Sequence, residues 1–80
     1  MAKVYLPADL SRHTGGVEIL EIDAPRVREL QQALAARFPA LAGEIERFAV
    51  AVDGEIYSDA PYHVLTSESE VYFIPRIAGG

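Results

Sequence analysis

The 80-residue chain contains no cysteine. This absence excludes disulfides, thiolate metal sites and a cysteine nucleophile. Long hydrophobic runs are also missing, because the apolar stretches are only a few residues long, far short of the roughly 20 residues of a membrane span. The N-terminus lacks the basic and then apolar order of a secretory signal peptide. We therefore expect no membrane partner and a cytoplasmic location.

Positive charge is sparse. Seven basic residues are scattered singly among 12 acidic ones, giving a net charge of −5. Without a basic stripe to neutralise phosphates, nucleic acid is not an expected partner. The two histidines, His13 and His63, do not stand at metal-ligand spacing. Asp9, Ser11 and His13 crowd into one loop, whereas a catalytic triad needs groups held apart by a scaffold. We expect no metal, no bound cofactor and no catalytic residue.

What remains is the composition of a small globular domain. Half of the residues are hydrophobic and 24% are charged, which is typical of a folded chain. Eighty residues suffice for one hydrophobic core and not for two. We therefore predict a single folded domain.

Two strands are predicted in the first quarter of the chain. Apolar residues alternate over residues 2–6, the period of a half-buried strand. Residues 7–16 are expected to form a polar loop ending in two glycines that permit a reversal. Residues 17–22 form the second predicted strand. Adjacent Ile19 and Leu20 interrupt its alternation, which a β-bulge would explain.

A helix follows the second strand. Asp23 is expected to accept hydrogen bonds from the first-turn amides, with Pro25 at a position that needs no donor. Apolar residues then recur at spacings of three and four, forming one stripe: Val27, Leu30, Leu34 and Phe38. Pro39 ends the helix at Phe38, and residues 41–45 are expected to form an irregular connector.

The second half of the chain begins with a predicted hairpin. Residues 47–52 alternate, with Phe48, Val50 and Val52 expected inward and Ala49 and Ala51 outward. Asp53-Gly54 matches a type I′ turn, and residues 55–57 form the return strand.

The last quarter of the chain predicts a loop and a final strand. Residues 58–70 are rich in turn formers and are expected to hold a short edge strand near Val64-Leu65. The last strand covers residues 70–74, where β-branched and aromatic residues dominate. Pro75 then closes it, because proline cannot donate to a ladder.

The order of elements, ββαββ(β), predicts an α+β fold of the β-grasp, or ubiquitin-like, type. One main helix packs on one face of a mixed sheet of four or five strands. The other face stays in water, so its outward residues form a candidate docking patch: Tyr5, Ala49, Ala51, Tyr72 and Ile74. Ordinary exposure of single apolar residues is the alternative. Arg12 is a further candidate for partner contact.

The folded domain is predicted to cover residues 1–75, with residues 76–80 as a flexible arm. Six residues from Pro75 to Gly80 can span at most roughly 20 Å. Glycine lacks a Cβ, so Gly79 and Gly80 can thread a channel too narrow for a side chain. We expect the Gly80 carboxylate to be the working group, held out by the residues before it: Pro75, Arg76, Ile77, Ala78 and Gly79. An ordinary frayed terminus is the alternative.

The run Val71-Tyr72-Phe73-Ile74-Pro75-Arg76-Ile77-Ala78-Gly79-Gly80 resembles the closing strand, proline and Gly-Gly ending of the ThiS/MoaD family. These are ubiquitin-like sulfur carriers, including the thiamin-pathway carrier and the small subunit of molybdopterin synthase. Arg76 stands where many members carry a second proline. The loop from Arg12 to Gly16 is more similar to carriers of a thiocarboxylate-dependent cysteine pathway and to archaeal small modifiers.

The resemblance implies that an E1-like adenylating enzyme uses ATP to convert the Gly80 carboxylate into an acyl-adenylate. A persulfide from a cysteine desulfurase or rhodanese-type donor then displaces AMP and leaves a thiocarboxylate. A downstream synthase takes the sulfur for molybdopterin, thiamin, cysteine or a specialised metabolite. The chain would be a co-substrate rather than an enzyme.

Two other functions stay open. A ubiquitin-like modifier would join Gly80 to lysines of target proteins through the same adenylate. The single lysine, Lys3, argues against chains of the modifier built on itself. A β-grasp interaction module with an inert arm is the third hypothesis. A natural extension beyond Gly80, trimmed by a protease, is compatible with all three.

Overall fold

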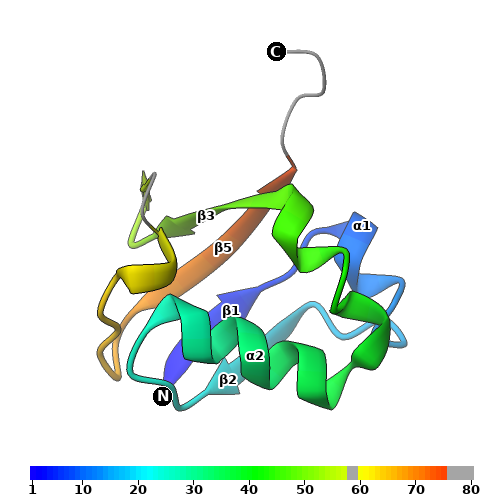
Figure 1. The fold of residues 1–80 in the computed structure, drawn as a ribbon, viewed down its shortest axis with the longest axis horizontal. Helices are drawn as coiled ribbons and strands as arrows, with labels where there is room; N and C mark the ends of the chain where they lie inside the picture. Colours follow the sequence, from blue (N-terminus) through cyan, green and yellow to red (C-terminus); the bar gives the residue numbers. More distant parts are fainter. Residues whose placement is uncertain (58–59, 76–80) are drawn as a thin grey trace.

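The computed structural model describes residues 1–57 and 60–75 of the chain. Within them, five strands form one sheet with the order β2-β1-β5-β3-β4 (Figure 1). The elements in chain order are β1 (Ala2–Tyr5), α1 (Ala8–Ser11), β2 (Ile19–Ile22), α2 (Val27–Arg37), the 3₁₀ turns η1 (Pro39–Leu41) and η2 (Ile45–Arg47), β3 (Phe48–Val52), β4 (Glu55–Ile56), the 3₁₀ turn η3 (Ala60–Tyr62) and β5 (Glu70–Pro75). The α+β fold of the β-grasp type is confirmed.

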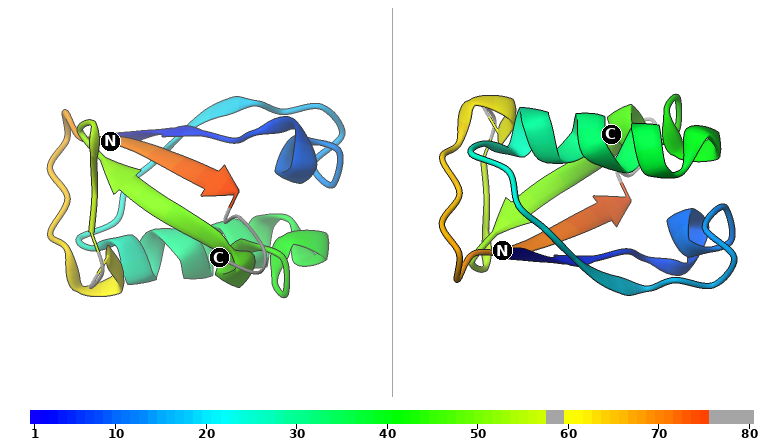
Figure 2. Two further views of the ribbon diagram at one scale, coloured as in Figure 1. Left: turned by 90° about the horizontal axis from the view of Figure 1, so that it is seen from above. Right: turned by 90° about the horizontal axis from the view of Figure 1, so that it is seen from below.

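The first and last strands lie side by side at the centre of the sheet. β1 and β5 run parallel, with Tyr5 opposite Tyr72, while the β1–β2, β3–β4 and β3–β5 pairs are antiparallel. α2 crosses one face of this sheet (Figures 1 and 2). The opposite face is therefore the open face of the mixed sheet.

The core lies between the sheet and α2. Val27, Leu30 and Leu34 of the predicted helical stripe are fully buried, and Phe38 is half-buried against the core. The sheet contributes alternate residues of its strands, including Val4, Val50, Val52, Val71 and Phe73. The predicted inward positions Phe48, Val50 and Val52 are confirmed, and so is the alternation over residues 2–6. Burial of this apolar surface is the main stabilising term of the fold.

The start of α2 differs from the prediction. The helix begins at Val27, its N-cap is Arg26, and no side-chain cap bond is present, so the expected capping by Asp23 is wrong. The Val27 N–H instead donates to the His63 carbonyl at 3.1 Å. Because this distant carbonyl satisfies the first amide, no side-chain cap is needed there.

The segment around His63 also includes Val64-Leu65, where an edge strand was expected. Val64 forms an isolated bridge with Arg26, outside the named strands, and Leu65 N–H donates to the Pro25 carbonyl at 2.9 Å. This segment therefore pairs with the entry to α2 and adds no strand to the sheet. The prediction of an edge strand there is wrong.

The loop predicted over residues 7–16 contains the helical turn α1. The N–H groups of Leu10 and Ser11 both donate to the Pro7 carbonyl at 2.9 Å, and Leu10 is fully buried. One apolar residue among polar ones gives no periodic signal, so sequence patterning missed the turn. Gly15 and Gly16 both have positive φ, which confirms the predicted reversal.

No bulge is needed in β2. Its register with β1 is continuous, and the strand begins at Ile19, two residues later than predicted. Ile19 lies on the open face and Leu20 faces the core, so the alternation is regular within the strand. The apparent interruption arose because residues 17 and 18 were counted as part of the strand.

The predicted hairpin turn is confirmed. Asp53 and Gly54 have φ values of 51° and 87°, as a type I′ turn requires. β4 is one residue shorter than predicted, and β5 extends one residue further to Pro75, opposite Phe48. The expected connector over residues 41–45 is occupied by parts of the two 3₁₀ turns. Among the described residues no helix is long and apolar enough to cross a membrane.

Candidate functional site

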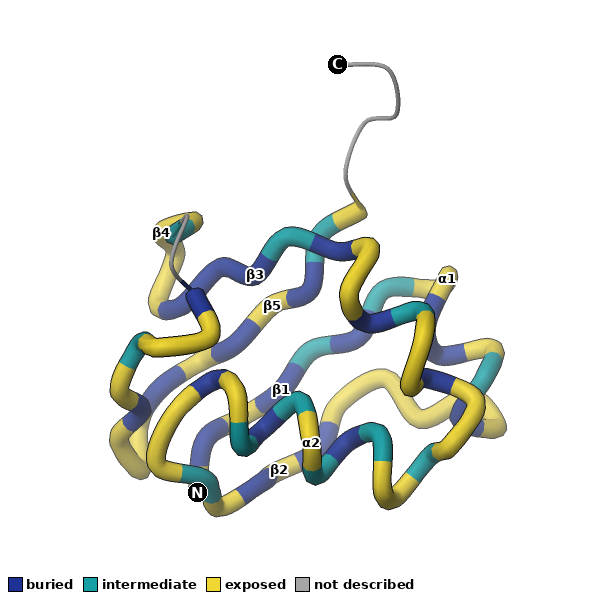
Figure 3. Tube along the Cα trace, viewed as in Figure 1, coloured by how far each residue is buried: buried dark blue, intermediate teal, exposed yellow. Residues whose placement is uncertain are grey.

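The register of the open face aligns one residue from each strand. Reading across the sheet from β2 to β4, these residues form what we call the apolar row: Ile19, Tyr5, Tyr72, Ala51 and Ile56. The alternation of buried and accessible positions that produces it is visible along β1 and β5 (Figure 3). Three of these residues were predicted from the sequence, and the two at the ends were missed.

Two tyrosines form the centre of the apolar row. The rings of Tyr5 and Tyr72 stack with centroids 4.3 Å apart and planes 5° from parallel. The Tyr5 hydroxyl donates to Glu70 Oε2 at 3.0 Å. Partial desolvation, then this hydrogen bond and the charge of Glu70, raise the pKa of Tyr5 to about 12. The stacked pair therefore presents a flat aromatic surface whose Tyr5 hydroxyl is held by Glu70.

The ends of the apolar row are more accessible than its centre. Ile19 is 55% exposed and Ile56 is 64% exposed, compared with 37% for Tyr72. Isolated exposed apolar residues need no explanation, but a contiguous row across a sheet indicates an interaction surface. The signal for Ile19 was the alternation of residues 19–22, which the longer predicted strand obscured.

Ala51 corrects one of the predicted patch residues. It lies in the apolar row between Tyr72 and Ile56 but is only 4% exposed. Its small side chain stands between two larger neighbours, which leaves little of it accessible. The expectation that Ala51 offers contact surface is therefore wrong. Ala49 and Ile74, paired across β3 and β5, are half-buried and lie one step closer to Pro75.

β5 holds Pro75 at one end of the sheet. The strand is paired with β1 and with β3. Pro75 lies opposite Phe48, the residue that directly follows η2. Because β1 runs parallel to β5, α1 also lies at this end. Arg12, the C-cap of α1, is exposed there, away from the apolar row. The predicted arm residues 76–80, Gly80 among them, lie outside the described residues.

The loop after α1 is held by internal hydrogen bonds. The Thr14 hydroxyl lies 2.9 Å from the carbonyl oxygens of both Ser11 and Val17, and it can donate to one of them at a time. The Gly16 N–H donates to the same Ser11 carbonyl at 2.9 Å. Thr14 is buried although it is polar. This loop is therefore a defined structure beside the end of β5.

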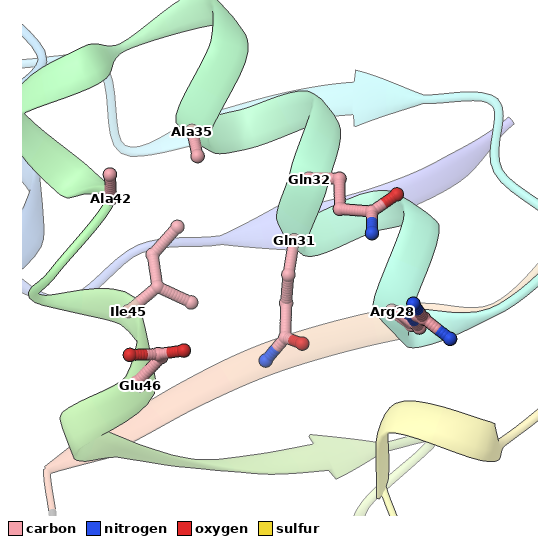
Figure 4. Close-up of a pocket in the computed structure, with 7 residues that line it drawn as sticks. All are labelled: Arg28, Gln31, Gln32, Ala35, Ala42, Ile45 and Glu46. Atoms are coloured by element: carbon pink, nitrogen blue, oxygen red, sulfur yellow. The ribbon is translucent and has the colours of Figure 1, made fainter.

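A second concave region lies on the helix side of the sheet. A cavity of about 270 Å³ lies between α2 and residues 42–46, with Gln31 on one wall and Glu46 on the other (Figure 4). A neighbouring cavity of about 370 Å³ shares these two residues. The polar residues that line the first cavity include Arg28, Gln31 and Glu46. None of them is a nucleophile paired with a base. Within residues 1–57 and 60–75, no group of acidic residues and histidines could hold a metal.

Comparison with known proteins gives a consistent result. The model of the ThiS family matches residues 4–80. A chain of the BexX/CysO complex from Amycolatopsis orientalis has a TM-score of 0.86 at 21% identity, with 100% of both chains covered. Small archaeal modifier protein 1 from Methanosarcina acetivorans has a TM-score of 0.85 at 20% identity, covering 99% of this chain and 95% of that one.

A third similar structure is the complex of subunits 1 and 2 of the molybdopterin-converting factor from Helicobacter pylori. One of its chains has a TM-score of 0.70 at 18% identity, covering 99% of this chain and 97% of that one. At such low identity these likenesses support the fold alone. No curated protein matches the sequence.

Proposed function

The chain belongs to the ThiS family, and from that premise we propose that it is a sulfur carrier working through Gly80. A partner adenylating enzyme uses ATP to activate the Gly80 carboxylate, with release of pyrophosphate. The sulfur of a persulfide then attacks the carbonyl carbon, and AMP leaves. Reduction of the acyl disulfide by a thiol leaves the thiocarboxylate, which a downstream synthase consumes. The chain itself is the co-substrate in each step.

The family match through Gly80 carries this proposal, and the position of β5 supports it. β5 is paired with β1 as far as Tyr72 and with β3 as far as Pro75, so the folded body sets where the last five residues begin. Five residues reach at most roughly 17 Å. An enzyme that holds the body could therefore receive Gly80 in its active site without unfolding the sheet.

The apolar row is the proposed docking surface for the adenylating enzyme. It combines a stacked tyrosine pair with exposed Ile19 and Ile56. Interfaces are enriched in tyrosine because it supplies a large contact area with few side-chain torsions to fix. Ala49 and Ile74 extend this surface toward Pro75, so a partner seated on it would lie close to the start of the arm.

Intact mass of the protein purified from its own host tests the chemistry. A thiocarboxylate adds about 16 Da, because sulfur replaces one oxygen. Treatment with iodoacetamide should alkylate that sulfur, and a chain lacking Gly79 and Gly80 should show neither change. Unmodified mass in cells that overproduce the adenylating enzyme and the sulfur donor would contradict the proposal.

Conjugation to target proteins is the second candidate. The likeness to small archaeal modifier protein 1 favours it, and the same adenylate can be attacked by a lysine amine. In that case, peptide mapping should recover Gly80 in isopeptide linkage to lysines of other proteins. Recovery only as such adducts, with no thiocarboxylate, would replace the carrier by the modifier.

A further inference from the structure

β2 is an outer strand of the sheet, and one of its edges is unpaired. Leu6 N–H donates to the Glu18 carbonyl at 2.7 Å, which fixes the side of the strand that faces β1. Since backbone groups alternate along an antiparallel ladder, those of Ile19 and Glu21 point away from β1. In the part of the chain that the structure describes, no hydrogen bond satisfies these outward groups. They form a free template for another strand.

The side chains beside this edge carry charge of one sign. The charged residues between Val17 and Ala24 are Glu18, Glu21 and Asp23, and all three are exposed. None of them forms an ion pair with another described residue. Lys3 lies opposite Glu21 on β1 but places its ammonium 6.0 Å from the centre of the Tyr5 ring. The carboxylates beside the edge are therefore available to a cationic partner.

α2 adds an unsatisfied carboxylate on the same side. Glu29 is half-buried, and its Oε1 atom is buried without a hydrogen-bond partner among the described residues. Two residues correspond to roughly 200° around a helix, so Glu29 lies on the flank of α2 opposite Gln31. Gln31 points to the η2 side, and β2 lies on the other side of α2 (Figure 4). Glu29 therefore adds negative charge on the β2 side of α2.

The negative charge beside the outer edge of β2 determines which kind of strand can pair with it. A second copy of the chain pairing through β2 would bring carboxylates against carboxylates, which is unfavourable across paired strands. Exposed Val17 and Ile19 offer apolar contact next to the carboxylates. We propose that the outer edge of β2 accepts an extended segment of a partner protein, with alternating apolar and lysine or arginine residues, as a sixth strand. This surface goes beyond the proposed function and is independent of any group on Gly80.

Solution NMR of the full ¹⁵N-labelled chain tests the proposal. The probe is a blocked peptide that alternates valine and lysine, added up to millimolar concentration. The largest shifts are expected at the amides of Ile19 and Glu21, together with slower hydrogen exchange there. The same peptide methylated at every backbone amide keeps its charge but loses its donors, and it should bind at least tenfold more weakly.

Charge variants provide the matched control. Glu21→Gln should weaken binding of the peptide by roughly threefold, the scale of an exposed ion pair, while Glu68→Gln, an equal change of charge outside β2, should leave it unaltered. Three results would overturn the proposal: no shift at millimolar peptide, equal binding of the methylated peptide, or shifts centred on Tyr5 and Tyr72. None of them bears on the mass test at Gly80.

Discussion

The two faces of β5 carry similar apolar side chains in different surroundings. Val71 and Phe73 are buried under α2, while Tyr72 and Ile74 point to the open face and stay partly accessible. Neighbouring residues of one strand thus serve two purposes. The covered face stabilises the domain, and the open face is free to contact a partner. Substitutions on the two faces should therefore have separable effects.

The largest effect is expected on the covered face. Phe73→Ala should lower the free energy of unfolding by about 3–5 kcal/mol, because the cavity is only partly filled by relaxation. For an 80-residue domain this is a large share of a total of roughly 4–12 kcal/mol. Urea denaturation followed by circular dichroism measures it. Tyr72→Ala should cost about 1 kcal/mol, the scale of a lost aromatic pair; equal losses would refute the separation of the faces.

Substitutions on the open face should instead change the affinity for a partner. Tyr72→Ala should weaken the complex with the adenylating enzyme by about tenfold or more, as buried tyrosines at the centre of an interface commonly do. Calorimetric titration measures the dissociation constant. Tyr62→Ala, at an exposed tyrosine on η3 outside the apolar row, is the matched control and should bind normally. A similar loss in both variants would place the interface elsewhere.

A backbone substitution should change stability without altering either face. Gly54 has φ of 87°, and a Cβ added there would meet open space, so Gly54→Ala introduces conformational strain and no clash. The expected cost is about 1–2 kcal/mol. Gly43→Ala, also in open space but without positive φ, should cost less than about 0.5 kcal/mol or be slightly stabilising. Thermal unfolding of the pair distinguishes strain from packing.

The smallest effect concerns the ionisation of Tyr5. Its pKa of about 12 lies above the ordinary value of about 10, so the folded state holds the proton more tightly than the unfolded one. The resulting stabilisation is complete below about pH 10 and is lost as the pH rises through about 12. Ultraviolet titration of tyrosinate should show a component near pH 12 that Glu70→Gln moves to lower pH, while the part caused by desolvation remains. An unchanged transition would exclude Glu70 as a cause.

Local patterns in the sequence were sufficient where local chemistry decides the structure. The Asp53-Gly54 turn, the stripe of α2 and the alternation of β3 each depend on residues close together in the chain. They were predicted correctly because turn geometry and periodicity are local properties. The Gly-Gly ending and the aromatic strand before it were equally visible, although the arm itself lies outside the described residues.

Two of the errors have a different cause. The carbonyl of His63 replaces Asp23 as the partner of the first amide in α2, and neighbours from two strands cover Ala51. Both depend on residues far apart in the sequence, which periodicity cannot report. The apolar row was found only in part for a different reason, because the local turn at Asp53-Gly54 already sets Ile56 opposite Ala51 and this pairing was not followed out to Ile56.

The parallel pairing of β1 with β5 has a consequence for biosynthesis. The Tyr5 hydroxyl bonds to Glu70, 65 residues later in the chain, so the centre of the sheet cannot close until the last strand has left the ribosome. Such long-range closure slows folding. It also means that β5 completes the sheet on which the proposed partner would dock. A nascent chain that still lacks β5 would thus offer no complete sheet to the proposed adenylating enzyme.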